Sequence, residues 1–389
     1  MTAPVIAPGG LAAPPPLTLY VHIPWCVRKC PYCDFNSHQV RDQIDEQAYA
    51  DALIADLEQA LPSVWGRRVH SIFFGGGTPS LFAPETIDTL LSAIRARLPL
   101  TYEVEITLEA NPGTVDAGKF AGFRAAGVNR LSLGIQSFDD RFLKALGRIH
   151  GGADAQRAAA LALEVFERVN LDLMYALPGQ TMQDALADVR QACLLGPQHL
   201  SCYHLTLEPN TAFYHDPPPL PDDDASAAMQ EAIEALVASH GYQHYETSAF
   251  SRAGGRCRHN LNYWLFGDYL GIGAGAHSKL SFQDRIVRQA RFKHPARYMA
   301  QVQSGSAIEQ EHALTFRDLP LEFMMNALRL TEGFDMALFE LRTGLPAGKI
   351  SQRVALAEAR GLLQRNGPVL QPTRQGQRFL NELLQLFMD

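Results

Sequence analysis

Three cysteines lie on one short segment of the chain, YVHIPWCVRKCPYCDF, as Cys26, Cys30 and Cys33 with the spacing C-x3-C-x2-C. They directly follow an apolar segment, LTLYVHI, that is typical of a β-strand. Three thiolates on one loop can hold three irons of a cubane 4Fe-4S cluster, and Phe35 stands where a further cysteine could follow. The spacing therefore predicts a cluster whose fourth iron has no protein ligand.

Two other interpretations of the cysteines are a zinc site and a group of buried thiols. Zinc favours a fourth protein ligand and paired C-x2-C spacing, and the nearby imidazoles of His22 and His38 do not complete such a set. Arg28 and Lys29 lie between the cysteines and would help to keep thiolates deprotonated. S-Adenosylmethionine can chelate an open iron through its amino and carboxylate groups. A 4Fe-4S cluster that binds this cofactor is therefore the favoured interpretation.

The elements that must position this loop recur through the first half of the chain. Apolar segments typical of strands occur at residues 17–23, 71–75, 103–109, 130–136, 170–178 and 199–207. Between them lie segments whose apolar residues repeat with the helical period of 3.6. Six strand-helix units in series predict parallel strands with right-handed crossovers, arranged as an open doubly wound sheet or as a partial barrel.

Polar and glycine-rich signals follow several of these strands. The second strand ends in the run GGGTP at 75–79, where missing side chains would let the backbone approach a ligand. No phosphate-loop pattern is present, so a plain tight turn is the alternative. Further polar residues at or near strand ends are Glu109, Gln136, Arg148 and Asp172. Each alone is more often structural, but their repeated placement predicts that they converge on one pocket.

The cysteine motif closely resembles that of the radical S-adenosylmethionine superfamily, and this resemblance favours the partial barrel. From about Leu17 to the C-terminus, the chain also resembles the oxygen-independent coproporphyrinogen III oxidase group and, within it, the haem-chaperone branch. The implied fold class is α/β: a partial (β/α)6 radical-SAM barrel followed by a mostly helical, winged-helix-like domain. The implied division is a disordered lead at 1–16, the barrel with an extension at 17–295, and the C-terminal domain at 296–389.

The resemblance also implies which residues form the site. The cluster ligands would be Cys26, Cys30 and Cys33. The S-adenosylmethionine pocket would contain Tyr20, Tyr32, Gly76, Gly77, Thr78, Glu109, Gln136, Arg148, Asp172 and His277. The last of these lies in GIGAGAHS at 271–278, which resembles the family's glycine-rich return to the cofactor. A dinucleotide-binding loop is disfavoured there, because alanines break the glycine spacing.

Two features separate the chain from the decarboxylating oxidase, which resembles C-x3-C-x2-C-x-C. Phe35 replaces the last cysteine. The short lead before Leu17 also predicts that the oxidase's long N-terminal extension is absent. The run HNLNYW at 259–264 instead resembles the HNxxYW signature of the haem-chaperone branch. His259 is thus a candidate haem ligand, with a hydrogen-bonded structural histidine as the alternative. Cys257 is either a second haem contact or an ordinary thiol.

Two functional classes remain open at this stage. In the first, the protein binds haem and transfers it to an acceptor protein, for example a respiratory haemoprotein, while carrying the cluster with S-adenosylmethionine. In the second, it is a radical enzyme that acts on a porphyrinogen-like substrate. We expect no coproporphyrinogen oxidase activity. In either class the cluster needs a reductant.

Composition limits the remaining classes. A net charge of -7 offers no basic footprint for nucleic acid, and no apolar run is long enough for stable membrane insertion. Six cysteines in 389 residues, three of them in one metal-type motif, fit a reducing compartment better than a disulfide framework. The sequence therefore predicts a cytoplasmic protein that does not bind nucleic acid and is not stably inserted in a membrane.

Overall fold

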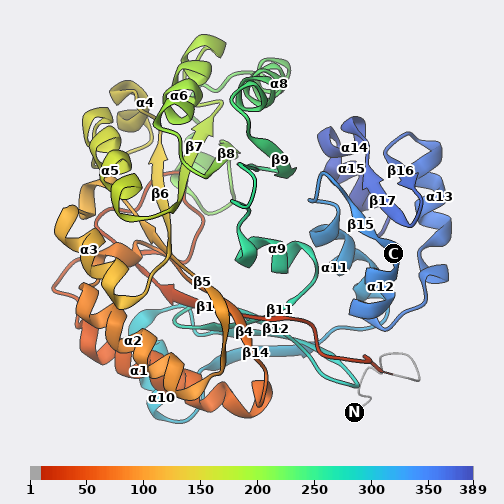
Figure 1. The fold of residues 1–389 in the computed structure, drawn as a ribbon, viewed down its shortest axis with the longest axis horizontal. Helices are drawn as coiled ribbons and strands as arrows, with labels where there is room; N and C mark the ends of the chain where they lie inside the picture. Colours follow the sequence, from red (N-terminus) through yellow and green to blue (C-terminus); the bar gives the residue numbers. More distant parts are fainter. Residues whose placement is uncertain (1–9, 389) are drawn as a thin grey trace.

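The structure is a computed structural model that describes residues 10–388, so residues 1–9 of the predicted N-terminal lead lie outside the described residues. Its framework is a curved sheet of twelve strands (Figure 1). The central strands run in chain order as β1 (Leu17–Ile23), β4 (Val69–Gly76), β5 (Leu100–Ala110), β6 (Arg130–Gln136), β7 (Arg168–Tyr175) and β8 (His199–His204). Each pairs in parallel with the next. The six predicted strands and the radical-SAM type of α/β fold are confirmed, and all six carboxyl ends meet at one edge.

Further strands extend both edges of this parallel core. Beyond β8 lie β10 (Ala249–Ser251) and β9 (Gln243–Glu246), both antiparallel. Beyond β1 lies β11 (Asp268–Ile272), a further parallel strand, followed by antiparallel β12 (His277–Ser281), β13 (Ile286–Arg291) and β14 (Ile308–Ala313). A separate short pair, β2 (Trp25–Cys26) and β3 (His38–Gln39), brackets the cysteine loop. The loop is therefore anchored at both of its ends.

Helices cover the convex face of the sheet (Figure 1). They are α1 (Glu46–Ala60), α2 (Pro84–Arg97), α3 (Ala117–Ala126), α4 (Asp140–Ala145), α5 (Gly152–Val165), α6 (Met182–Leu195), α8 (Asp223–Ser239) and α10 (Pro295–Gln303). Their apolar faces join the strands in one core, as with Leu53, Ile87 and Phe120. Capping side chains set several helix starts, such as Thr181 at α6. Within residues 10–388, no helix has the length and apolarity needed to cross a membrane.

Two short helices lie on other faces. Helix α7 (Ala212–His215) follows β8, and α9 (Arg258–Trp264) carries the whole HNxxYW run. Helix α9 packs against β1, β4 and β11 on one side and against the C-terminal domain on the other. Figure 1 shows it between these two parts of the molecule. The signature therefore lies at an internal junction of the fold.

The C-terminal domain is mostly helical, as predicted. It contains α11 (Asp318–Ala327), α12 (Met336–Thr343), α13 (Ser351–Ala359), α14 (Arg374–Arg378) and α15 (Leu380–Gln385), with a small sheet of β15 (Phe334–Asp335), β17 (Val369–Pro372) and β16 (Leu363–Asn366). It has its own core around Phe323 and Phe339. Because α10 packs on α1 and β14 joins the large sheet, we propose a domain boundary near residue 314 in place of the predicted 296.

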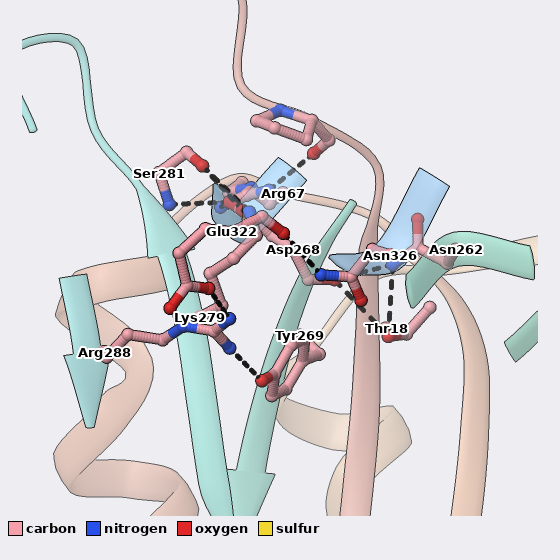
Figure 2. Close-up of polar contacts among 11 residues, drawn as sticks. Thr18, Arg67, Asn262, Asp268, Tyr269, Lys279, Ser281, Arg288, Glu322 and Asn326 are labelled. Carbon is pink, nitrogen blue, oxygen red and sulfur yellow. Dashed lines mark hydrogen bonds and ion pairs between the residues drawn. The ribbon is translucent and has the colours of Figure 1, made fainter. Parts of the chain in front are cut away.

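A buried ion-pair cluster stabilises strands β11 and β12, which lie next to β1 in the sheet (Figure 2). Asp268 of β11 accepts hydrogen bonds from Lys279 and Arg67, both at 2.8 Å, and from the backbone and hydroxyl of Ser281. Burial alone would raise the pKa of Asp268, but the two cations hold it below its usual value. The carboxylate is therefore ionised in the folded protein and matched by buried donors.

We expect Asp268→Asn to lower the free energy of unfolding by about 3–5 kcal/mol, because it leaves Lys279 buried without a counter-charge. Because the folded pKa is lowered, the stabilisation is present above the unfolded pKa and is lost as pH falls through the folded value. Denaturant unfolding measures the effect. As a control, Asp284→Asn removes an exposed pair and should change stability by less than about 1 kcal/mol. Equal effects of the two variants would contradict the assignment.

Candidate functional site

The three cysteines occupy a tight loop after β1. Cys26 belongs to β2, and the backbone N–H of Cys33 donates to the carbonyl of Cys30 at 3.2 Å. All three line one cavity of about 380 Å³ at the carboxyl ends of the parallel strands. Thr78 donates to the sulfur of Cys26 at 3.4 Å, and Arg148 donates to the sulfur of Cys30 at 3.6 Å. These donors favour thiolates that face the cavity.

The donor set fits a cubane cluster. Burial raises the pKa of the Cys26 and Cys33 thiols, so full ionisation there needs a bound positive centre, which a metal cluster supplies. Among residues 10–388, no three Cys, His, Asp or Glu side chains lie close enough to hold one metal ion. A cubane needs no such convergence, because its thiolates bind different irons.

The first cavity brings together most of the residues predicted for the cofactor pocket. These are Tyr32, Gly76, Gly77, Thr78, Glu109, Gln136, Arg148 and Asp172. Tyr32 comes from the cysteine loop and Arg148 from the segment between α4 and α5. The others come from four neighbouring strands or the turn after β4, as the parallel order requires. Gln136 has a φ of 69°, rare for a residue with a side chain, at a register shift of β6 against β7. Such local strain is typical of functional sites.

Two carboxyl groups face the first cavity. Glu109 accepts a hydrogen bond from the Gly76 backbone at 3.1 Å, and burial together with Asp172 raises its pKa to about 8. Asp172 accepts from Ser132 at 2.9 Å and from Asn170 at 2.8 Å, and burial raises its pKa as well. These groups can bind hydroxyl or ammonium groups of a ligand, and ligand charge would favour their ionisation.

The sequence analysis missed Asn111 and Ser132, which also line the first cavity. The predicted residue Arg148 donates to the side chain of Asn111 and, at 2.8 Å, to the carbonyl of Gly134. These two hydrogen bonds help to hold its guanidinium beside Cys30. Asn111 in turn donates to Thr78 at 2.9 Å. Its place two residues after Glu109 was the available signal. Ser132 faces inward with alternate residues of β6, which strand periodicity could have indicated.

Tyr20 and His277 lie in a second cavity of about 600 Å³ beside the first. The two cavities share Cys33, Phe35 and Glu109 among their walls. The predicted pocket is thus divided between adjoining spaces, with the end of the cysteine loop between them.

His259 is placed away from both cavities. Its side chain is buried, its Nδ1 pairs with the Ser71 hydroxyl at 2.9 Å, and its ring stacks on Phe73 with centroids 4.9 Å apart. Burial lowers its pKa to about 3, so the ring is neutral. Its Nε2 has no hydrogen-bond partner within residues 10–388. Cys257 is also buried, where its sulfur contacts Glu105 at 3.6 Å.

We expect the unfolding free energy of the ligand-free protein to fall more steeply with pH than that of Glu109→Gln between about pH 4.5 and about pH 8. A raised folded pKa gives stability that is complete below the unfolded pKa and is lost as pH rises through the folded value. Denaturant unfolding across this range measures the slope, with the exposed Glu85→Gln as control. Identical slopes for wild type and Glu109→Gln would contradict the pKa assignment.

Comparisons with known proteins agree with this geometry. Residues 20–192 match the Radical SAM superfamily, and residues 314–379 match the HemN C-terminal domain. The chain is 49% identical over 376 residues to "Heme chaperone HemW" of Escherichia coli strain K12, covering 96% of this chain and 98% of that protein. It is also 49% identical over 380 residues to "Heme chaperone HemW" of Haemophilus influenzae, with the same coverage.

Among solved structures, the fold is similar to the radical SAM enzyme coproporphyrinogen III oxidase, HemN, from Escherichia coli. The TM-score is 0.82 at 25% sequence identity, over 96% of this chain and 90% of the oxidase. Barrel and C-terminal domain therefore both have counterparts in that structure.

Proposed function

We propose that this protein binds haem and transfers it to an acceptor protein, because the chain belongs to the heme chaperone HemW family within the radical SAM superfamily. The observation that carries this proposal is the 49% identity to HemW proteins over nearly the whole of both chains. The acceptor that we propose is a haemoprotein, for example a respiratory one. A cytoplasmic location stays a prediction.

We also propose that the protein carries a 4Fe-4S cluster with S-adenosylmethionine on its open iron. Cys26, Cys30 and Cys33 would hold the cluster, and the first cavity would hold the cofactor. When reduced by a partner, the cluster supplies single electrons to the sulfonium. The chain's own contribution is to position Arg148 beside Cys30 and to present Glu109 and Asp172 to polar groups of the cofactor.

The first cavity contains most of the residues predicted for the cofactor pocket, and this supports a second candidate function, a radical enzyme acting on a porphyrinogen-like substrate. Its carboxyl groups and its arginine are all in place around the cysteine loop. Against the oxidase itself stands Phe35, which is 60% exposed at the junction of the two cavities. In the decarboxylating enzyme's pattern this position carries a fourth cysteine, so the two proteins would differ where the cavities meet.

We expect the cluster-reconstituted protein to bind one haem per chain and His259→Ala to bind it about threefold to tenfold more weakly, since an aromatic contact is worth roughly 0.5–1.5 kcal/mol. The His259 ring supports Tyr263 and Tyr20, with centroids 5.1 and 6.5 Å away. Anaerobic titration followed by absorbance measures affinity, and deoxyadenosine release in the same preparation separates carrier from catalyst. His70→Ala, exposed on β4, is the control. Absence of haem binding by the wild type would contradict the proposed function.

We expect no decarboxylation of coproporphyrinogen III under anaerobic, reducing conditions. The reason is the replacement of the oxidase pattern's last cysteine by Phe35. Protoporphyrinogen formation is the measurement, with the oxidase HemN from Escherichia coli as the positive control. Product above the protein-free blank would favour the second candidate.

A further inference from the structure

The second cavity is lined by aromatic side chains, of which only Tyr20 was predicted for the cofactor pocket. Tyr263 comes from α9, Tyr269 from β11 and Phe35 from the cysteine loop, and Tyr20 closes the space from β1. Its volume of about 600 Å³ lies in the range of specific ligand sites. Aromatic walls drawn from four elements fit a large, flat ligand better than a chain-like one.

The charges around this cavity favour an anion. Lys29 donates to the carbonyls of Phe35 and Ser37, both at 3.2 Å, so its charge is held at the cysteine loop. No hydrogen bond or ion pair is recorded for the Lys293 side chain within residues 10–388. The wall also has two acidic groups, Asp34 and Glu109, against the two lysines. Burial and Asp172 raise the pKa of Glu109 to about 8, which reduces its negative charge near neutral pH and leaves the lysines in excess.

Two histidines line the cavity, and only one has a free ring. His22 uses both nitrogens, with the Tyr20 hydroxyl at 3.0 Å and the Asn36 carbonyl at 2.8 Å. His277 is exposed at the start of β12, and no hydrogen bond to its ring is recorded in the described part of the chain. Partial burial of the ring and the nearby Lys293 lower the pKa of His277, so the ring is neutral near pH 7. A neutral imidazole with a free nitrogen is a ligand for haem iron.

The wall that carries His277 is held in place by long-range contacts. Figure 2 shows Arg288 of β13 donating both to Tyr269 and to Glu322 of α11 in the C-terminal domain. Lys279, two residues after His277 and therefore on the same face of β12, is fixed by Asp268. His277 thus projects from a strand that pairs with β13 and is held against β11 by the buried ion pair of Lys279 with Asp268.

We propose that haem binds in this second cavity, with His277 as an axial ligand of the iron and Lys293 as the partner of a propionate. This inference rests on the proposed haem-chaperone function and specifies where the haem lies. In this arrangement His259 packs behind Tyr263 and Tyr20, which form the aromatic floor of the second cavity, and does not contact the iron. Cys33 and Glu109 line both cavities, so the bound haem would adjoin the cluster loop.

Anaerobic haemin titration of the cluster-reconstituted full-length protein tests the site. We expect His277→Ala to weaken binding by at least about tenfold and to change the ligation bands of the absorption spectrum, because an axial bond is lost. Lys293→Gln should weaken binding by about threefold without a spectral change, as for an exposed ion pair. His259→Ala should weaken binding and keep the wild-type ligation bands, and His70→Ala should match the wild type.

A rescue experiment separates ligation from structural damage. Added imidazole should restore the wild-type ligation bands in His277→Gly, since it can occupy the vacated position. An unchanged spectrum and affinity in His277→Ala would overturn the assignment of this histidine, as would loss of the wild-type bands in His259→Ala alone. Both results would leave the haem-chaperone proposal standing. Only a wild-type protein that takes up no haem would overturn that proposal.

Discussion

The parallel pairing of β1 with β4 is the constraint on which the site depends. The cysteine loop leaves β1 and the glycine-rich turn leaves β4, and two backbone hydrogen bonds join them, from Gly77 to Ile23 at 2.8 Å and from Thr78 to Trp25 at 2.7 Å. A Cβ atom on Gly77 would lie 2.5 Å from the Trp25 carbonyl oxygen. Only glycine allows this approach, so the turn and the loop form a single wall of the cavity.

Burial makes it costly to ionise the thiol and carboxyl groups of the first cavity, and a positively charged ligand can offset that free-energy cost. Burial alone opposes ionisation of Cys26, Cys33, Glu109 and Asp172. A metal cluster and a cationic sulfonium would each reverse that preference. The first cavity therefore favours positively charged ligands. The second cavity, with Lys29, Lys293 and the neutral imidazole of His277, favours an anionic ligand.

The C-terminal domain contributes to the second cavity without lining it. Besides the contact between Arg288 and Glu322, Arg329 lies over the ring of Trp264 at 4.3 Å and forms an ion pair with Glu246. These contacts fix β13 and the end of α9. Because Tyr263 precedes Trp264 in that helix, movement of the domain would move an aromatic wall of the cavity. The HNxxYW run thus contacts both parts of the molecule.

The sequence by itself determined the features that depend on local pattern. Strand periodicity predicted the six parallel strands, and the cysteine spacing identified the loop. The polar residues chosen at strand ends, such as Glu109 and Gln136, line the first cavity. Tertiary structure alone decided that His259 is buried beneath the aromatic floor and that His277 faces a separate cavity with Tyr20. The face of the molecule that a side chain occupies depends on how its strand or helix packs against elements far away in the chain. The residues next to it in the sequence do not show which elements those are.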